Sequence, residues 1–191
     1  MILRLLVVLA AAHARKVDVL LLSAAGCPYC QGSIVGPIND MVSLCEPIVQ
    51  VTQVPFGNNY YTTKACGGEP YDPDTRHCWA STCVGTDDDA CFSGDIVAQL
   101  GIDEARVNRL ESCAKHSTED WTVYWKFLVC MEGHYELALN ATIPCARDAG
   151  LSLKDLYECY LGPRGDQVQA KEANATIDHD SVPWLLVNGT V

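Results

Sequence analysis

The chain has 191 residues, with 24 acidic and 13 basic side chains and a formal charge of −11. This length suits one domain with a substantial core and is short for two. Because no basic run occurs beyond Arg15-Lys16, nucleic acid and anionic membrane surfaces are poor candidates as partners. The chain has 11 cysteines, a high count that indicates a compartment where disulfides persist.

The N-terminus has the pattern of a secretory signal peptide. A basic start at residues 1–4 precedes an apolar run, and Ala12-His13-Ala14 matches an A-x-A cleavage site. We therefore expect a signal peptide at 1–14 and one domain at 15–191, which enters the secretory pathway and ends in the lysosome or outside the cell. No later segment approaches the ~20 apolar residues of a membrane span, so no membrane contact is expected after signal removal.

The stretch from Val17 to Ile38 predicts a strand, a tight turn and a helix. Residues 17–22 form an apolar, β-rich run that is typical of a strand buried on both faces. Small residues then allow a sharp turn at Ala24-Ala25-Gly26. Beyond the turn, one face of a helix is marked by apolar residues at steps of three and four, namely Cys30, Ile34, Ile38, Met41, Val42 and Cys45.

This pattern places Cys27-Pro28-Tyr29-Cys30 at the start of that helix. Proline suits the first helical position, and a cysteine at a helix start in Cys-x-x-Cys can have its pKa lowered from about 8.5 to about 3.5–7.5. We expect Cys27 to be the attacking thiolate and Cys30 the resolving thiol. The alternative is a pair of ordinary framework cysteines or half of a zinc site, and the strand–turn–helix context favours redox chemistry.

The remaining cysteines are candidates for structural disulfides. They are Cys45, Cys66, Cys78, Cys83, Cys91, Cys113, Cys130, Cys145 and Cys159. Candidate glycosylation sites, from the N-x-[ST] pattern, are Asn140, Asn174 and Asn188. The first two lie in polar stretches, whereas Asn188 follows an apolar strand, which disfavours it.

Gly36-Pro37 predicts a kink in the first helix, which ends by Cys45. A second strand at 48–54 completes a β-α-β order, which is typical of parallel strands. From 55 to 94 the sequence is rich in Gly, Pro, Asp, Tyr and Cys, and it predicts a long loop stapled by disulfides.

Two metal sites are conceivable in this loop. His77, Cys78, Cys83 and Cys91 have zinc-binding side chains, but their spacing lacks paired Cys-x-x-Cys knuckles. The run 87–89 is acidic, but it lacks the alternation and the glycine of a calcium loop. We therefore expect no metal and no other cofactor.

Helical patterns follow. One begins at Ile102 with Asp103 as its cap, and a second apolar stripe runs from Trp121 to Met131. A third helix, 153–161, has a capping-box-like start at Ser152 and ends at Gly162-Pro163. A more polar helix is expected at 166–175. Finally, 181–189 predicts a strand that ends in Asn-Gly, a hairpin-turn signal.

The order of predicted elements resembles a thioredoxin fold, which is an α/β fold. It consists of a strand, a Cys-x-x-Cys helix, a second strand, a helical stretch, and Val182-Pro183 before a further strand. Relative to that fold, the chain has a Cys-rich loop and helical insertion at about 56–178. The resemblance implies that Pro183 is cis and faces the Cys-x-x-Cys. It also implies that the backbone at Val182 pairs with an extended substrate.

More specifically, the chain is similar to the gamma-interferon-inducible lysosomal thiol reductase family. The matching stretches include Val54-Pro-Phe-Gly57-Asn58, Phe127-Leu-Val-Cys130-Met-Glu132, Leu156-Tyr-Glu-Cys159, Gly162-Pro-Arg-Gly165 and the segment 179–189. In three respects the chain departs from the family. The Cys-Gln-His-Gly signature is replaced by Cys78-Trp-Ala-Ser, the Pro28-Tyr29 dipeptide is that of glutaredoxins, and the last strand and helix are missing, so a truncated C-terminus is expected.

The sequence thus predicts a thiol oxidoreductase that reduces protein disulfides through Cys27 and Cys30. Its partners would be disulfide-bonded protein substrates and a small-thiol or protein electron donor. One alternative is an oxidase or isomerase of disulfides on the same fold. The other is a secreted, disulfide-stapled binding protein without catalysis.

Overall fold

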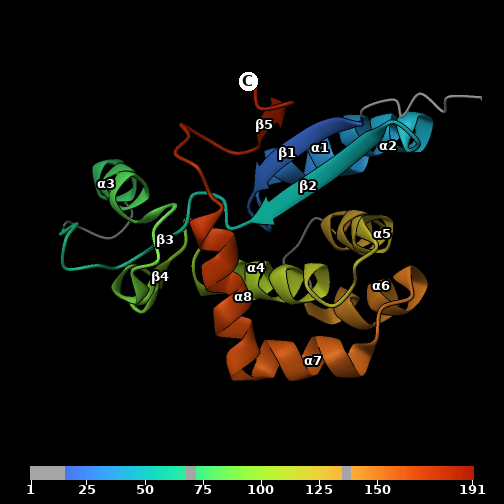
Figure 1. Ribbon diagram of the computed structural model, residues 1–191. Helices are drawn as coiled ribbons and strands as arrows, with labels where there is room; N and C mark the ends of the chain where they lie inside the picture. Colours follow the sequence, from blue (N-terminus) through green and yellow to red (C-terminus); the bar gives the residue numbers. More distant parts are fainter. Residues whose placement is uncertain (1–15, 68–71, 135–138) are drawn as a thin grey trace, which may run out of the picture.

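The computed structural model describes residues 16–67, 72–134 and 139–191, and the expected signal peptide lies outside the described residues. Its largest sheet has three strands in the order β2-β1-β5, with β1 (Val17–Ser23) in the middle. The second strand, β2 (Val49–Pro55), runs parallel to β1, with Val17 opposite Val49. The third, β5 (Trp184–Val187), is antiparallel to β1 (Figure 1). The predicted β-α-β unit with parallel strands is confirmed.

A helix interrupted by a kink connects β1 to β2. It consists of α1 (Pro28–Ser33), a π-helical turn (Ile34–Ile38) and α2 (Asn39–Cys45). The kink predicted at Gly36-Pro37 is confirmed, because Gly36 has non-helical dihedral angles there. Its buried face, which includes Ile34 and Ile38, packs on the sheet. This packing fixes where the helix begins, next to the carboxyl end of β1 (Figure 1).

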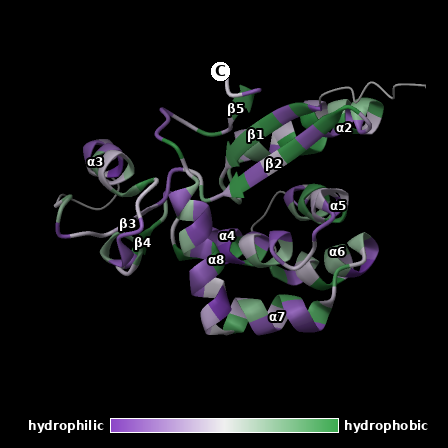
Figure 2. Ribbon diagram, viewed as in Figure 1, coloured by the Kyte–Doolittle hydropathy of each residue, from purple (hydrophilic) through white to green (hydrophobic). Residues whose placement is uncertain are grey.

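The helices of the insertion form a second layer beside the sheet (Figure 1). They are α4 (Ile102–Lys115), α5 (Trp121–Glu132), α6 (Thr142–Ala149), α7 (Leu153–Leu161) and α8 (Pro163–Asn174). In Figure 2 the central strand β1 is mostly hydrophobic, β2 alternates between hydrophobic and hydrophilic residues, and α8 is largely hydrophilic. The main apolar core lies between these layers and includes Leu21, Leu110 and Phe127.

Four helices were predicted in this layer and a fifth was not. Ser152 caps α7 as predicted, since its side chain accepts a hydrogen bond from the N–H of Asp155. The cap of α4 was predicted wrongly: Gly101 occupies the N-cap position and Asp103 lies in the first turn. The polar helix α8 begins at Pro163 and not at 166. Helix α6 was not predicted from the sequence.

The segment 55–94 is not only a loop, which corrects the prediction. It contains α3 (Pro73–Cys83), a 3-10 turn (Asp89–Phe92) and β3 (Tyr60–Tyr61), which pairs with β4 (Ile96–Val97). Asp72 caps α3 by accepting a hydrogen bond from the N–H of Asp74. A second apolar cluster, with Phe56, Tyr61 and Trp79 in mutual ring contact, holds this region together.

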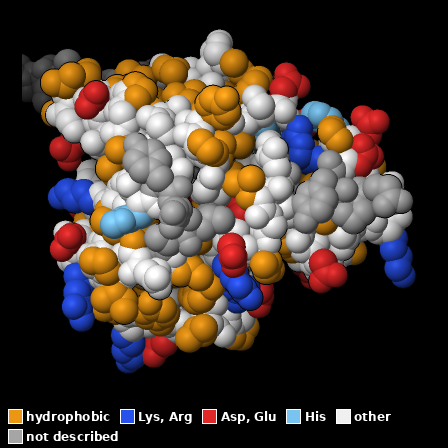
Figure 3. Space-filling view, turned by 180° about the vertical axis from the view of Figure 1, so that it is seen from behind, with side chains coloured by type: hydrophobic (Ala, Val, Ile, Leu, Met, Phe, Trp, Pro, Cys, Tyr) orange, Lys and Arg blue, Asp and Glu red, His pale blue; other side chains and the backbone are white. Residues whose placement is uncertain are grey.

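The predicted hairpin turn after β5 is confirmed. Asn188 and Gly189 have φ values of +50° and +79°, and Val187 and Thr190 form a β-bridge across them. Two positive φ values suit a type I′ turn, which explains the Asn-Gly pair. At the surface, acidic, basic and apolar side chains are interspersed (Figure 3). Within the described ranges, no helix combines the length and the apolar character that crossing a membrane requires.

Candidate active site

Cys27 lies where the chain leaves the sheet and enters a helix. Gly26, with φ +74°, makes the turn after β1, and Pro28 is the first residue of α1. Cys27 is therefore the N-cap residue, and its sulfur accepts a hydrogen bond from the N–H of Cys30 at 3.4 Å. An N-cap side chain takes up an N–H group that has no partner within the helix. Here that side chain is a thiol, so the hydrogen bond favours its ionised form.

The two cysteines of this pair have opposite environments. Cys27 is half-buried, whereas Cys30 is 0% exposed. Hydrogen bonds from the Cys30 side chain, and from the N–H groups of Cys30 and Tyr29, lower the pKa of Cys27 to about 6, against a smaller opposing effect of burial. The same hydrogen bond with Cys27, together with burial, raises the pKa of Cys30. Above pH 6, Cys27 is thus mostly an accessible thiolate, whereas the buried Cys30 beside it stays a protonated thiol.

The peptide bond between Val182 and Pro183 is cis and lies opposite this pair. The Cys27 sulfur is 3.9 Å from the carbonyl oxygen of Val182. Both residues line a cleft of about 240 Å³, and Tyr29 at its edge is 79% exposed. The geometry that the resemblance implied at Cys27, Cys30, Val182 and Pro183 is therefore present, and the roles of these residues remain proposals.

Two contacts hold the active-site turn in place. The N–H of Ala25 donates to the Asn108 side-chain oxygen at 2.9 Å, which ties the turn to α4. Gly57, after β2, packs against Ala24 so closely that a Cβ at this position would lie 2.4 Å from the Ala24 Cβ. Its φ of +58° also favours glycine. The insertion and the β2 turn together fix the position of Cys27.

Three buried carboxyl groups behind the pair were missed by the sequence analysis. They are Glu104, Glu111 and Glu132, and each is 3% exposed or less. Burial raises the pKa of Glu104 and that of Glu132 to about 7, and it also raises the pKa of Glu111 well above its usual range. Helical spacing could have revealed two of them, because Glu111 follows Val107 by four residues and Glu132 follows Leu128 by four, on apolar stripes.

Glu104 is the carboxyl group that lines the Cys27 cleft. One of its oxygens accepts the N–H of Leu100 at 2.6 Å, and the other, Oε1, has no hydrogen-bond partner among the described residues. The negative charge of Cys27 contributes to the raised pKa of both Glu104 and Glu132, after burial. Ionisation of the thiol and of these acids is therefore coupled.

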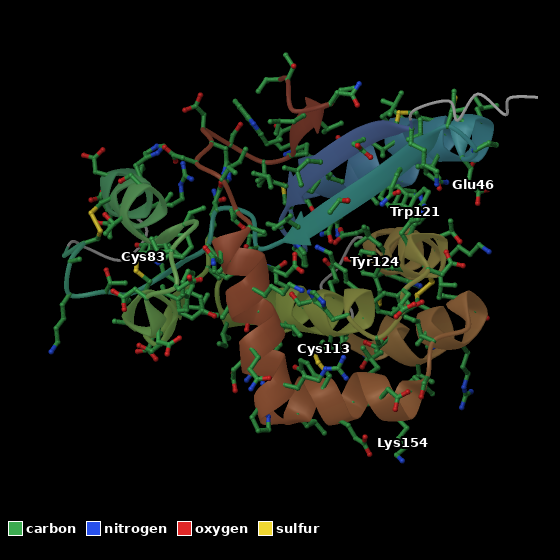
Figure 4. All side chains as sticks on the ribbon, in the orientation of Figure 1. Glu46, Cys83, Cys113, Trp121, Tyr124 and Lys154 are labelled. Atoms are coloured by element: carbon green, nitrogen blue, oxygen red, sulfur yellow. A yellow bond between two sulfur atoms is a disulfide. The ribbon has the colours of Figure 1, made fainter. Side chains whose placement is uncertain are left out.

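All 11 cysteines lie in the described residues, and eight of them form four disulfides. The pairs are Cys66–Cys78, Cys83–Cys91, Cys113–Cys159 and Cys130–Cys145. In Figure 4, Cys83 lies at α3, and Cys113 lies between α4 and α7, which its disulfide joins. The expectation for Cys45 needs correction: its thiol is free, half-buried at the end of α2.

The conceivable metal sites have other roles in the structure. Cys78, Cys83 and Cys91 are in disulfides, and Asp88 accepts a hydrogen bond from the N–H of Ala90 as the cap of the 3-10 turn. Among the described residues, the side chains close enough to share a metal ion are those of Cys130, His134 and Cys145, and the two cysteine sulfurs are bonded to each other.

The three sequons differ in their surroundings. Asn140 is exposed beside α6. In contrast, Asn174 bridges to a distant loop, because its side-chain oxygen accepts the N–H of Gly85 and its NH₂ group donates to the carbonyl of Thr86. Asn188 lies in the turn after β5, and its side-chain oxygen accepts the N–H of Asp18. Glycosylation at any of these positions remains a prediction.

Comparison with known proteins supports the fold. The crystal structure of a candidate protein disulfide isomerase from Nitrosomonas europaea matches with a TM-score of 0.52 and 16% identity, over 91% of this chain and 85% of the other. The fold is thioredoxin-like. The predicted fold class is confirmed.

In sequence, the chain is similar to a gamma-interferon-responsive lysosomal thiol protein from Arabidopsis thaliana, with 26% identity over 98 residues. This match covers 49% of the chain and 40% of the relative, so it spans less than half the relative's length. The relative bears out the resemblance noted from the sequence. No protein-family model matches the chain.

Proposed function

We propose that this protein is a thiol oxidoreductase that reduces disulfide bonds of proteins, with Cys27 as nucleophile and Cys30 as resolving thiol. The observation that carries the proposal is the Cys27 sulfur itself, which is half-exposed and accepts the Cys30 N–H at 3.4 Å beside the cis Val182–Pro183 bond. The thiol protein and the candidate disulfide isomerase found by comparison support the same class of activity.

The reaction has two exchange steps. The Cys27 thiolate attacks one sulfur of the substrate disulfide, that bond breaks, and the other substrate sulfur leaves as a thiolate that takes up a proton. Cys30 then loses its proton and attacks the Cys27 sulfur, which releases the second substrate thiol. Two electrons pass to the substrate, and the Cys27–Cys30 pair becomes a disulfide. A small thiol or a protein dithiol would reduce it again.

The pKa of Cys27 supports activity in an acidic compartment. At pH 5 a thiol with a pKa of about 6 is roughly one-tenth ionised, whereas an ordinary thiol with a pKa of about 8.5 is only about 0.03% ionised. Such a compartment agrees with the lysosomal relative, and the four disulfides agree with passage through the secretory pathway. We therefore place the activity in the lysosome or outside the cell.

Insulin reduction at pH 5 with a thiol donor tests the proposal. The Cys27→Ser variant should lose all activity, because among the described residues that line the cleft Cys27 is the one with a thiol. Cys30→Ser should accumulate mixed disulfides that appear as substrate adducts in mass spectra. Cys45→Ser is the matched control, since it also removes a free thiol and should keep full activity. Activity that survives Cys27→Ser would overturn the mechanism.

The rival function on the same fold is a disulfide oxidase or isomerase. A stabilised Cys27 thiolate favours the dithiol form of the pair, which makes the disulfide form more oxidising. The reduction potential of the Cys27–Cys30 pair distinguishes a reductase from an oxidase or isomerase. For this two-electron couple, a difference of about 30 mV corresponds to about 1.4 kcal/mol. A value near that of thioredoxin, about −270 mV, supports the reductase, and a value near about −120 mV supports an oxidase. A binding protein without catalysis would leave Cys27 unreactive toward disulfides.

A further inference from the structure

A second hollow adjoins the Cys27 cleft. It is a cavity of about 220 Å³ between α3 and the segment before the cis proline, and Asn58 and Gln99 line both hollows. These two side chains are joined by a hydrogen bond, since the Asn58 NH₂ group donates to the Gln99 side-chain oxygen at 2.8 Å. A cavity of this volume has room for a long side chain.

The chain itself runs from one hollow to the other. Asp180 lines the cavity, and Ser181 and Val182 line the cleft. Two residues of chain span at most about 7 Å. A substrate chain that lies along Val182 with its disulfide at Cys27 therefore passes within reach of the cavity. Because side chains two residues apart point to the same side of an extended chain, the side chain that reaches the cavity belongs to a residue about two positions from the reacting cysteine.

The charges around the cavity favour a cation. Asp72 and Asp180 line it, and Asp178 lies just behind, against the single guanidinium of Arg76. Arg76 is 7% exposed and already engaged: it donates to the His179 carbonyl, contacts the His77 ring nitrogen Nε2 at 3.2 Å and pairs with Asp178 at 3.7 Å. Three carboxylates and one guanidinium leave a formal charge of −2.

The His77 ring also lines this cavity. Its Nδ1 lies 2.8 Å from the Asp178 carboxylate, and its Nε2 lies 3.2 Å from an Arg76 nitrogen. Asp180 is exposed and makes no hydrogen bond or salt bridge with the described residues. Figure 3 shows acidic, basic and histidine side chains gathered at this end of the molecule, over α3.

The walls suit the stem of a long basic side chain. Tyr60 and Val97, from the paired strands β3 and β4, contribute apolar surface to the cavity, together with Pro73 at the start of α3. Lysine and arginine bury their methylene stems against apolar surface while the charged end stays at polar groups. A stem along Tyr60 and Val97 would bring its charged end to the carboxylates of Asp72 and Asp180.

We propose that this cavity is a substrate subsite for a lysine or arginine side chain about two residues from the reacting cysteine of the disulfide substrate. The proposal rests on the proposed function, because the cysteine at Cys27 defines the position of the substrate. It assigns a selectivity to the α3 region, which the thiol chemistry alone does not need.

The test uses disulfide-linked peptides with lysine, norleucine or glutamate two residues before or after the cysteine. For the wild-type protein, kcat/KM should be about 3- to 5-fold higher for the lysine peptide than for the norleucine peptide, as for a partly exposed ion pair. The preference should shrink at high salt, which screens exposed charges. Asp180→Asn should reduce it to within about 1.5-fold and leave turnover of the norleucine peptide unchanged.

Asp148→Asn is the matched control, because this exposed aspartate on α6 loses the same charge far from the cavity. It should keep the lysine preference. Equal kcat/KM for the lysine and norleucine peptides, or an equal loss in both aspartate variants, overturns the subsite. A preference for glutamate also overturns it, and would assign Arg76 as an anion site.

A binding experiment separates this proposal from the catalytic one. Cys27→Ser protein is titrated with the same oxidised peptides, and the lysine peptide should bind about 3- to 5-fold more tightly than the norleucine peptide. If the wild-type protein reduces no peptide but this difference in binding is found, the proposed chemistry is wrong and the subsite stands. If peptides are reduced and bind without regard to charge, the subsite is wrong and the chemistry stands.

Discussion

Cys27 and Cys30 have opposite environments because the hydrogen bonds between them have a fixed direction. Cys27 accepts at the start of α1, and Cys30 donates from within the helix. The interaction stabilises the thiolate at position 27 and the thiol at position 30, and burial of Cys30 increases the difference. The difference in pKa between the two thiols therefore follows from the direction of the helix and from burial.

This asymmetry predicts the alkylation behaviour of the reduced protein. The rate of iodoacetamide reaction at Cys27 should rise with pH through an inflection near 6, while Cys30 stays unmodified in the same pH range. In Cys30→Ala the inflection should move upward, because the side-chain hydrogen bond that lowers the pKa most is lost. Mass spectrometry of tryptic peptides after short alkylation pulses gives both rates. An inflection near 8.5 would contradict the role of the hydrogen bond.

The sequence identifies this pair well because the signal is local. A buried strand, small residues and a Cys-x-x-Cys before a helical face are contiguous, so the geometry follows from the chain alone. The buried carboxyl groups are different. Glu104 becomes part of the site only because α4 packs across the active-site turn, and no pattern near Cys27 indicates that contact.

At the scale of elements, the prediction was best where periodicity is strong. The apolar stripe of α5 and the capped start of α7 predicted the bounds of these two helices to within about one residue. In contrast, α3 has few strong helix formers, with threonine, histidine, cysteine and aspartate along its length, so a loop was predicted. Its start was nevertheless encoded by Asp72-Pro73, an N-cap followed by proline at the first position.

Disulfides connect the elements of the insertion with different loop lengths. Cys113–Cys159 joins α4 to α7 across 46 residues, whereas Cys83–Cys91 closes only eight. In the chain-entropy model the longer loop stabilises by about 4 kcal/mol and the shorter by about 2.5 kcal/mol. Replacing both cysteines of each pair by alanine should reproduce this order in urea unfolding. A larger loss for the Cys83–Cys91 pair would show that local packing outweighs loop closure.

At the scale of the whole molecule, the helical layer brings acids into the centre of a thioredoxin-like fold. Glu104 and Glu111 come from α4 and Glu132 from α5, and all three are buried. An acid whose pKa is higher in the folded than in the unfolded chain stabilises the fold fully below the unfolded pKa, and this contribution is lost as the pH rises through the folded pKa. This contribution to stability is therefore larger in acid than at neutral pH.

The expected window runs from pH 4.5, the ordinary pKa, to about 7, the folded pKa of Glu104 and Glu132. In a Cys27→Ser background, which removes the opposing titration of the thiolate, the free energy of unfolding should fall between pH 5 and 8. In the double variant Glu104→Gln/Glu132→Gln this fall should be smaller by several kcal/mol, because each unit of pKa shift corresponds to about 1.4 kcal/mol. Denaturant unfolding at a series of pH values measures it.

The matched control for this experiment is Glu119→Gln/Glu158→Gln, which changes two exposed acids. In this control, the free energy of unfolding should fall between pH 5 and 8 by as much as in the Cys27→Ser protein. Equal pH dependence in both double variants would mean that the buried acids do not carry the effect. Remaining contributions, such as the lowered pKa of buried His179, are common to all variants and cancel in the comparison.

The unpaired thiol at position 45 gives the molecule a built-in internal standard. When the active-site pair closes, the number of titratable sulfhydryls falls from three to one, while the four cross-links stay as they are. A colorimetric thiol count on denatured protein therefore reads the oxidation state of a preparation directly. A count of one thiol per chain is expected when Cys27 and Cys30 are oxidised to a disulfide and the four structural disulfides are unbroken.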